Sequence, residues 1–433
     1  MGTEIDLTVG GIPLDFSKND MGIDHGFLFQ ESDRTRCHAE GIDYDYYKAH
    51  PEEDLALDEA AFIRPLRRVL PRLDLTGHMI DAARAEYEAV VGDAHELESE
   101  DAPVPAKGFM SFDEFCEFCG RFSLDGLDAA YIEYEDPDRD VKSRGRFAGM
   151  TEEMQRIPNG PPQMYWSERS FFGSSVAILS SYSMLQVFGK SQRHAEAPVV
   201  WQYGPLVVAG WAEVTDFNGG ARRAETMLVA TEGTSDARIL KRALDVLQPD
   251  IADFFRFIDV NERHPFWGTG ALTKFAEGLV RIDVQNKVLF VLDNDAEGLE
   301  AYRRLIELKM PTNMQAMVLP ELECFKQFSA RGPEGVNLAD INRRAAGIEC
   351  YLDLNLPSYP PAQVVWTNYK TGLDTWHGAL EHKDSYAQHF YEQDDADLIA
   401  GSYDTTKLRA ILGALLGEAA RLSEIPKWLR QYE

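Results

Sequence analysis

Between residues 226 and 319 the chain alternates short apolar runs with longer amphipathic segments. Runs rich in Val, Leu, Met and Phe, which are typical of buried strands, cover residues 226–231, 254–260, 288–292 and 314–319. The segments between them, at residues 235–246, 270–282 and 296–309, repeat apolar residues at the helical period. Strands that alternate with helices form parallel sheets. The sequence therefore predicts an α/β fold, with a Rossmann-like parallel sheet and helices on both faces.

Two of these apolar runs end in carboxylates. Glu232 follows the first run, and Asp293 and Asp295 follow the run at residues 288–292. The carboxyl ends of parallel strands meet at one edge of a sheet, where ligands collect, and acidic groups crowded there repel one another unless a cation separates them. Mg²⁺ takes hard oxygen ligands and keeps waters for phosphate groups. We therefore expect phosphodiester hydrolysis, in which the cation activates water and stabilises the leaving oxygen.

The three carboxylates have distinct expected roles. Glu232 would bind metal or act as general acid or base, and Gly233 lets the backbone pass close to a substrate. Asp293 and Asp295 lie two residues apart at a strand end, so both can reach one ion. The alternative interpretation of these two aspartates is a solvated turn.

The length of the chain indicates how many domains to expect, and its composition indicates a cellular compartment. A chain of 433 residues is expected to fold as two or three domains. It has no apolar run long enough for a membrane span, no apolar signal core at its acidic start, and five cysteines, an odd number. These features favour the cytoplasm and predict no membrane partner.

Charge opposes simple nucleic-acid binding. The net charge is -29, whereas affinity for nucleic acid normally depends on neutralising phosphates. The segment from Ala221 to Met310 is nearly balanced, with 13 Lys and Arg against 15 Asp and Glu. The acidic excess therefore lies mostly outside the segment that carries the carboxylate motifs, and a nuclease stays compatible with the composition.

The first 220 residues are expected to form an α+β domain. Strand-like sequence opens the chain, helical periodicity follows at residues 55–91, and Val, Trp and Tyr suggest strands at residues 198–215. Residues 96–105 are acidic and Pro-rich, as in an exposed linker. The turn cluster at residues 216–220 is the expected boundary, which gives an N-terminal domain at 1–220.

The carboxylate motifs resemble those of the Toprim fold, the catalytic core of topoisomerases, bacterial primases and overcoming-lysogenization-defect nucleases. Its signature is a strand ending in Glu-Gly, here Glu232-Gly233, and a second strand ending in Asp-x-Asp-x-x-Gly, here Asp293-Asn294-Asp295-Ala296-Glu297-Gly298. The resemblance implies a catalytic domain at residues 221–330. Residues 331–433 are expected to form a mostly helical extension that completes the site, with one strand near residues 363–367.

The N-terminal part is similar to a bacterial domain found fused to HEPN or Toprim modules. Two segments carry this resemblance, Asp15-Phe16-Ser17-Lys18-Asn19 and Asp24-His25-Gly26-Phe27-Leu28-Phe29-Gln30. A HEPN ribonuclease needs an Arg and a His a few residues apart on one helix, and neither Arg36 with His38 nor Arg193 with His194 has that spacing.

Three further residues enter through the resemblance to the overcoming-lysogenization-defect nucleases. It implies Asp236 and Glu349 as metal ligands and Lys383 as an active-site lysine that stabilises phosphate charge. Each also has an ordinary interpretation. Asp236 suits a helix N-terminus, Glu349 could be a solvated helical residue, and Lys383 could be a surface lysine.

The expected function is a Mg²⁺- or Mn²⁺-dependent endonuclease, with DNA favoured, in defence against phage or plasmid DNA. Cleavage of RNA such as transfer RNA and a non-catalytic sensor or scaffold subunit stay open as alternatives. The segment Phe188-Gly189-Lys190-Ser191 ends like a P-loop but lacks its first Gly and its strand. Regulation is therefore expected from the N-terminal domain or from a separate ATPase or other defence-system chain, and a homo-oligomer stays open.

Overall fold

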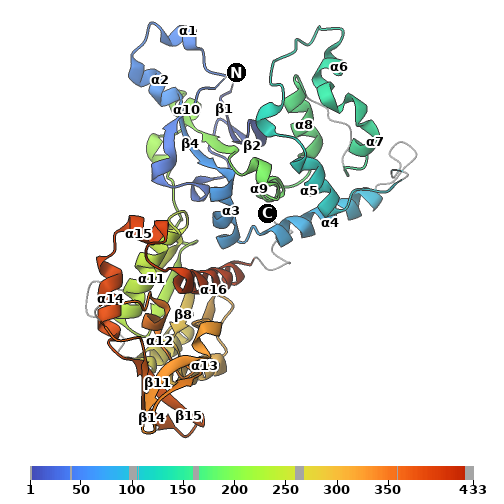
Figure 1. Cartoon of the computed structure of the whole chain (residues 1–433). Coiled ribbons are helices and arrows are strands. Elements are labelled where there is room, and N and C mark those ends of the chain that lie inside the picture. The colour runs from blue at the N-terminus through green and yellow to red at the C-terminus, as the bar shows by residue number, and fades with distance from the viewer. Residues whose placement is uncertain are drawn as a thin grey trace. The chain divides into compact units, whose positions relative to one another are not determined.

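The computed structural model describes residues 2–39, 41–96, 105, 107–158, 165–258, 268–357 and 359–424. The chain folds into two compact units, Met1–Ala221 and Arg222–Glu433. Each unit contains its own sheets and helices (Figure 1). The predicted linker at residues 96–105 lies almost entirely outside the described residues.

The first unit is built on a five-stranded sheet in which every neighbouring pair is antiparallel. The strand order is β2-β1-β5-β4-β3. Its strands are β1 (Glu4–Val9), β2 (Ile12–Lys18), β3 (Arg34–Arg36), β4 (Ala60–Pro65) and β5 (Pro198–Gln202). Strands β1 and β5 alternate buried and less buried residues, as expected of a sheet with one face on a core.

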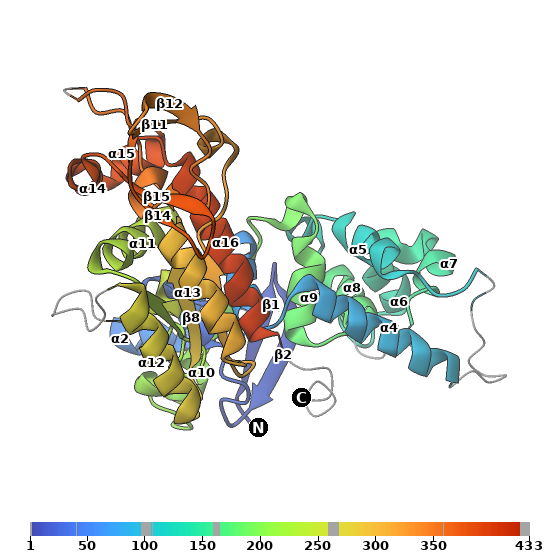
Figure 2. The ribbon, with the colours of Figure 1, turned by 90° about the horizontal axis from the view of Figure 1, so that it is seen from below.

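Helices surround this sheet and bury a core rich in aromatic side chains. They are α1 (Tyr44–Tyr47), α2 (Glu52–Asp58), α3 (Leu66–Leu75), α4 (Ile80–Glu96), α5 (Phe112–Gly120), α6 (Arg139–Arg144), α7 (Thr151–Met154), α8 (Glu168–Val176), α9 (Ser181–Gly189) and α10 (Gly204–Val208). Helices α4 and α9 pack side by side (Figure 2). Sheet and helices together make the expected α+β arrangement.

The helical pattern at residues 55–91 and the strand pattern at residues 198–215 were each partly wrong. Strand β4 interrupts the first, and its buried Ala61, Phe62 and Arg64 belong to the sheet. Helix α10 follows β5, because Gly204 and Pro205 open a helix directly after the strand.

Among the described helices, no single one is long and apolar enough to cross a membrane. Helices α8 and α9 pass the same test of length and composition only as a pair, which is bent by 108° at its break.

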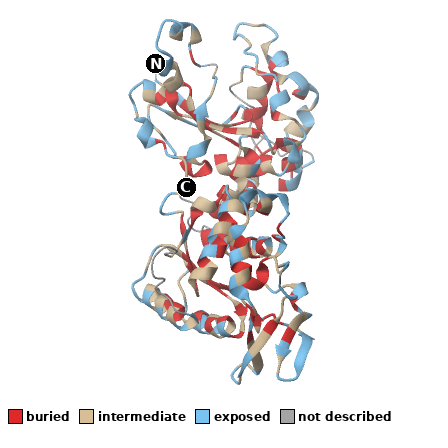
Figure 3. Ribbon diagram, turned by 60° about the vertical axis from the view of Figure 1, so that its left-hand side comes forward, coloured by how far each residue is buried: buried red, intermediate tan, exposed pale blue. Residues whose placement is uncertain are grey.

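The second unit contains the parallel sheet that the alternation predicted. Its order is β10-β8-β6-β7 and every pair is parallel. The strands are β6 (Met227–Thr231), β7 (Phe255–Phe257), β8 (Lys287–Leu292) and β10 (Met314–Val318). The last two residues of the run at 254–260 lie outside the described part. The inner strand β8 is buried at five of its six residues. Figure 3 marks buried residues in red.

Helices cover both faces of this sheet. On one face, α12 (Thr269–Arg281) and α13 (Ala296–Glu307) pack against Val288, Phe290 and Ala316. On the other, α16 (Thr406–Ser423) contacts β10 and packs beside α11 (Thr234–Leu247). The Gln315 side chain, which alternates with Ala316, donates a hydrogen bond to Glu418 of α16.

The described part of the extension at residues 331–433 contains three α-helices, as expected, but the expectation of a single strand there was wrong. A second sheet has the order β12-β11-β14-β15, and a small pair joins β13 to β9. The strands are β9 (Asn294–Asp295), β11 (Phe328–Gly332), β12 (Gly335–Ala339), β13 (Ala345–Ala346), β14 (Val364–Lys370) and β15 (Thr375–Leu380), and the helices that follow are α14 (Lys383–Glu392) and α15 (Asp395–Ala400). Strand β14 includes the expected strand near residues 363–367.

Candidate functional site: a cluster of carboxylates at the sheet edge

Glu232 stands immediately after β6, where the chain turns into α11. Gly233 occupies the N-cap position of that helix and donates its main-chain N–H to Asp236 Oδ2 at 2.9 Å. The Thr231 hydroxyl donates to Gly233 O at 2.9 Å and tightens the same turn. The carboxylates of Glu232 and Asp236 therefore leave the sheet at one short strand-to-helix connection.

Asp293 and Asp295 flank Asn294 directly after β8. Asp295 is the N-cap of α13 and accepts the Gly298 N–H at 2.7 Å. Gly298 has to be glycine, because a Cβ there would lie 2.2 Å from Asp293 O. The glycine that ends this motif thus lets α13 begin close to the aspartate at the strand end.

The two strand ends meet. The Asp293 main-chain N–H donates to Glu232 Oε1 at 3.0 Å, which joins the exits of β6 and β8 directly. Because β6 and β8 are parallel neighbours, both carboxylates lie at the same sheet edge.

Glu349 joins this group from a segment that packs across the strand ends. It lies in a 3-10 turn, Ile348–Tyr351, where the Ile348 N–H donates to Asp293 Oδ1 at 2.9 Å. Glu349 is buried, and its Oε1 accepts the Ser235 hydroxyl at 3.2 Å. A Cβ on Gly347 would lie 3.3 Å from Asp293 Oδ2 and 3.4 Å from Glu349 Oε2, so both oxygens lie beside the same glycine.

These hydrogen bonds share a pattern. The cluster consists of five carboxylates, those of Glu232, Asp236, Asp293, Asp295 and Glu349. In each of them, one oxygen accepts a hydrogen bond from a main-chain N–H or a hydroxyl. Donors fix the side chains in place, but none of these bonds supplies a full positive charge to offset the carboxylates.

The electrostatics of the cluster reflect this lack of counter-charge. Burial, followed by the charge of Asp295, raises the pKa of Glu232 to about 8. Burial and then Glu349 raise the pKa of Asp236 to about 7. The pKa of Asp293 is raised well above its usual range, by burial first and then by Asp236, Glu232 and further neighbouring carboxylates, and burial also raises that of Asp295. The cluster therefore resists full ionisation without a cation.

Basic groups lie at the margin of the cluster. Lys383, the first residue of α14, is exposed, and its charge lowers the pKa of Asp236. His377 on β15 places Nδ1 3.8 Å from Asp295 Oδ2, and its side chain is 16% exposed. Lys370 pairs with Glu297 at 2.9 Å and lowers the pKa of that carboxyl. These basic groups thus act on different carboxylates: Lys383 on Asp236, His377 on Asp295, and Lys370 on Glu297.

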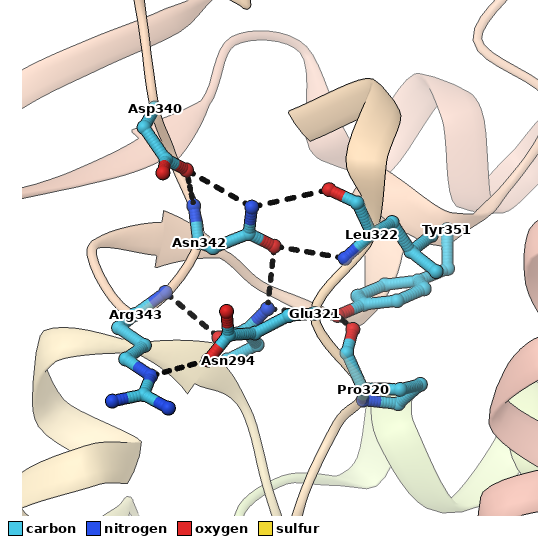
Figure 4. A network of polar contacts seen from close by, with 8 residues as sticks. All are labelled: Asn294, Pro320, Glu321, Leu322, Asp340, Asn342, Arg343 and Tyr351. Carbon is cyan, nitrogen blue, oxygen red and sulfur yellow. Dashed lines mark hydrogen bonds and ion pairs between the residues drawn. The ribbon is translucent and has the colours of Figure 1, made fainter. Parts of the chain in front are cut away.

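Asn294 anchors the loop between the two aspartates. It is fully buried, and its Nδ2 donates to Asn342 Oδ1 and Tyr351 OH, both at 3.2 Å, while its Oδ1 accepts the Arg343 N–H at 2.7 Å (Figure 4). Asn342 in turn bonds both main-chain groups of Leu322. A satisfied buried amide of this kind fixes the backbone on which Asp293 and Asp295 stand.

The donor set fits an oxygen-liganded divalent cation in its chemistry. Within the described ranges, however, no three His, Cys, Asp or Glu side chains are arranged to enclose one metal ion. Mg²⁺ does not require such a cage, because it binds through one or two carboxylates and retains several waters.

The structure thus brings together the five carboxylates that the sequence singled out, with Lys383 beside Asp236. Two members of the site were not foreseen from the sequence. Nothing in the sequence marks His377, because its approach to Asp295 depends on the placement of β15. Asn294 lay inside the motif, but its role as an anchor depends on partners near residues 320–351.

A family model, described as HEPN/Toprim N-terminal domain 1, matches residues 1–225. This match includes the whole first unit and the Asp15 and His25 segments that carried the N-terminal resemblance. No curated protein and no solved structure matches the chain. Because the family model covers more than half of the 433 residues, the chain belongs to the HEPN/Toprim N-terminal domain 1 family.

Proposed function

We propose that the second unit carries a Toprim-type nuclease site that hydrolyses phosphodiester bonds with Mg²⁺ or Mn²⁺. DNA is the favoured substrate, and defence against phage or plasmid DNA is the proposed role. The single observation that carries this proposal is the junction of β6 and β8, where Asp293 N–H donates to Glu232 Oε1 and places both carboxylates at one edge.

The family assignment supports a nuclease-related role independently of the site. The family of the first unit is named for its association with HEPN and Toprim modules. The second unit has the Glu-Gly and Asp-x-Asp-x-x-Gly motifs of the Toprim type at the ends of adjacent parallel strands.

The electrostatics support a divalent cation as the missing counter-charge. Burial and the charges of neighbouring carboxylates raise the pKa of Glu232, Asp236 and Asp293. A cation bound to the carboxylate oxygens would relieve this repulsion, and the energy released would add to its binding. Asp293 and Glu349 present oxygens beside the same glycine and would hold it, with Asp236 as their neighbour. Bound there, the cation would activate water and offset charge on the leaving oxygen.

The remaining groups have roles that follow from their positions. Glu232 lies at the same sheet edge as Asp293, where it is placed to exchange a proton with a reacting oxygen. Lys383 is exposed close to Asp236, where it can bind a phosphate oxygen of the substrate.

The test incubates purified protein with supercoiled plasmid, linear duplex DNA and transfer RNA, each with Mg²⁺, with Mn²⁺ and with chelator. We expect cleavage of DNA that requires the cation and falls at least roughly 100-fold in Glu232→Gln. Glu307→Gln is the matched control, since Glu307 is an exposed residue at the end of α13.

Each other outcome corrects a stated part of the proposal. Cleavage of transfer RNA alone would replace DNA with RNA as substrate. Cleavage that persists in chelator or in Glu232→Gln would contradict the assigned chemistry. A protein that neither cuts any substrate nor binds Mn²⁺ in calorimetry would favour a sensor or scaffold role.

A further inference from the structure

Strand β10 forms a free edge of the parallel sheet. Among the strands that the structure describes it pairs with β8 alone, and two flanking hydrogen bonds show which of its peptide groups face β8. Val288 N–H donates to Asn313 O and Leu319 N–H donates to Leu292 O, both at 2.9 Å. In a parallel ladder alternate residues face the partner strand. The odd-numbered residues of β10 therefore face β8, and Ala316 and Val318 point their N–H and C=O groups away from it.

A groove of about 510 Å³ runs along this edge. Ala316 and Val318 form part of its floor, Leu299 and Tyr302 of α13 line one side, and Ala414 of α16 lines the other. In the part of the chain that the structure describes, no hydrogen bond engages the outward N–H or C=O groups of Ala316 and Val318. The groove thus combines apolar walls with two unpaired peptide units.

Three arginines line the same groove. Arg343 pairs with Glu321 and Arg421 with Glu418, and these arginine side chains are 63% and 66% exposed. Arg303 of α13 is exposed and has no acidic partner within the described ranges. Each glutamate in the groove is matched by an arginine, so Arg303 leaves an excess of positive charge.

We propose that this groove binds an extended acidic segment of a partner protein, which adds a strand to the free edge of β10. An extended peptide offers N–H and C=O groups in alternation, as the edge does, and pairs with both. A DNA backbone offers acceptors only, which leaves the outward carbonyls of Ala316 and Val318 without donors. The arginines select acidic over basic segments.

The geometry also defines the segment. Strand β10 has five residues, so the groove accepts a stretch of about five residues at about 3.3 Å each. Alternate side chains of the added strand point toward α13 and toward α16, because side chains alternate across a strand. In a segment of alternating acidic and apolar residues, the acidic side chains therefore share the face toward Arg303, and the apolar side chains share the face toward Ala414.

The test measures the fluorescence anisotropy of a short, capped, labelled peptide of alternating glutamate and valine with the full chain. We expect saturable binding that weakens roughly five- to tenfold in Arg303→Glu. The matched control is Arg304→Glu, since Arg304 is the next residue of α13 but pairs with Glu300 and does not line the groove. Replacing glutamate by lysine in the peptide should also weaken binding to the native chain.

A modified peptide tests strand addition without altering the protein. Methylation of every peptide nitrogen removes all main-chain donors and should abolish binding. Methylation of alternate nitrogens leaves one edge able to pair and should be tolerated. Equal binding of all three peptides would contradict strand addition.

The competing occupants give different results. Single-stranded DNA that binds in place of the peptide, and is weakened by Arg303→Glu, would overturn the peptide in favour of nucleic acid. Concentration-dependent dimers that Arg303→Glu disrupts, without peptide binding, would assign the edge to a second copy of the chain. Absence of binding in every arm would overturn the proposal. None of these readouts depends on nuclease activity.

Discussion

Replacing Asp236 by Asn should stabilise the protein while weakening the response to divalent cations. Asp236 is placed beside Glu349, and its Oδ2 accepts the Gly233 N–H at 2.9 Å. An asparagine side-chain oxygen can accept the same hydrogen bond, so the substitution removes the charge and keeps the turn. The repulsion within the cluster should therefore decrease.

The size and sign of this effect follow from the raised pKa. Burial and Glu349 raise the pKa of Asp236 from 3.8 to about 7. The folded state therefore holds its proton to higher pH than the unfolded state does, and stability is lost as pH rises from about 4 to about 7. One pKa unit corresponds to about 1.4 kcal/mol, which sets an upper bound of roughly 4 kcal/mol at pH 8. Because an amide is also penalised by burial, we expect a gain of about 2 kcal/mol.

Thermal unfolding in chelator at pH 5.5 and pH 8 measures this gain. A gain of about 2 kcal/mol raises the Tm of a unit of this size by roughly 4–8 °C at pH 8. At pH 5.5 the charge effect is only about 2 kcal/mol and the burial penalty of the amide offsets it, so the Tm should hardly change. Asp245→Asn is the control, because Asp245 lies on the same helix in an exposed pair with Lys241. A variant that is destabilised at pH 8, or a gain that does not change with pH, would refute the reasoning.

Three further predictions concern the surroundings of the cluster. Gly298→Ala should lower the free energy of unfolding by roughly 2–4 kcal/mol in denaturant titrations, because the added Cβ would lie 2.2 Å from Asp293 O. The control Gly278→Ala has open space around it and should stabilise helix α12 slightly. Equal effects of the two substitutions would contradict the close approach at Gly298. Asn294→Ala should cost roughly 2–4 kcal/mol in the same assay, because it removes the acceptor of the Arg343 N–H and one hydrogen bond each from Asn342 and Tyr351, and a loss under about 0.5 kcal/mol would show that the network does not hold the loop. Lys383→Gln should raise the pKa of Asp236, so the increase in Tm that Mg²⁺ causes should appear at higher pH than in the native chain. The control Lys241→Gln should leave this pH dependence unchanged. If Lys383→Gln also leaves it unchanged, Lys383 lies outside the site.

The parallel sheet could be predicted from the sequence because its signals are local. The strand at β8 is a continuous apolar run, and α13 begins at an Asp that caps it. Carboxylates that follow parallel strands were expected at one sheet edge, but the direct adjacency of β6 and β8 depends on the strand order, which no local signal specified. The 3.6-residue period of α11 and α12 identified those helices in the same way.

The second sheet of this unit could not be predicted in the same way. Strand β12 is exposed along almost its whole length, so it shows no alternation of buried and polar residues. Glu349 was expected on a helix, but the segment is a short 3-10 turn whose position depends on the bond from Ile348 N–H to Asp293. His377 reaches Asp295 through the pairing of β14 with β15, a contact that no local pattern specifies.

Anomalous diffraction from crystals soaked in Mn²⁺ tests the central claim most directly, because it locates the cation without reference to activity. We predict a manganese peak within bonding distance of carboxylate oxygens from at least two residues of the cluster, with Asp293 among them, and no such peak in Asp293→Asn crystals. Manganese bound only elsewhere on the molecule, in crystals of a protein that cleaves DNA with Mn²⁺, would contradict this claim.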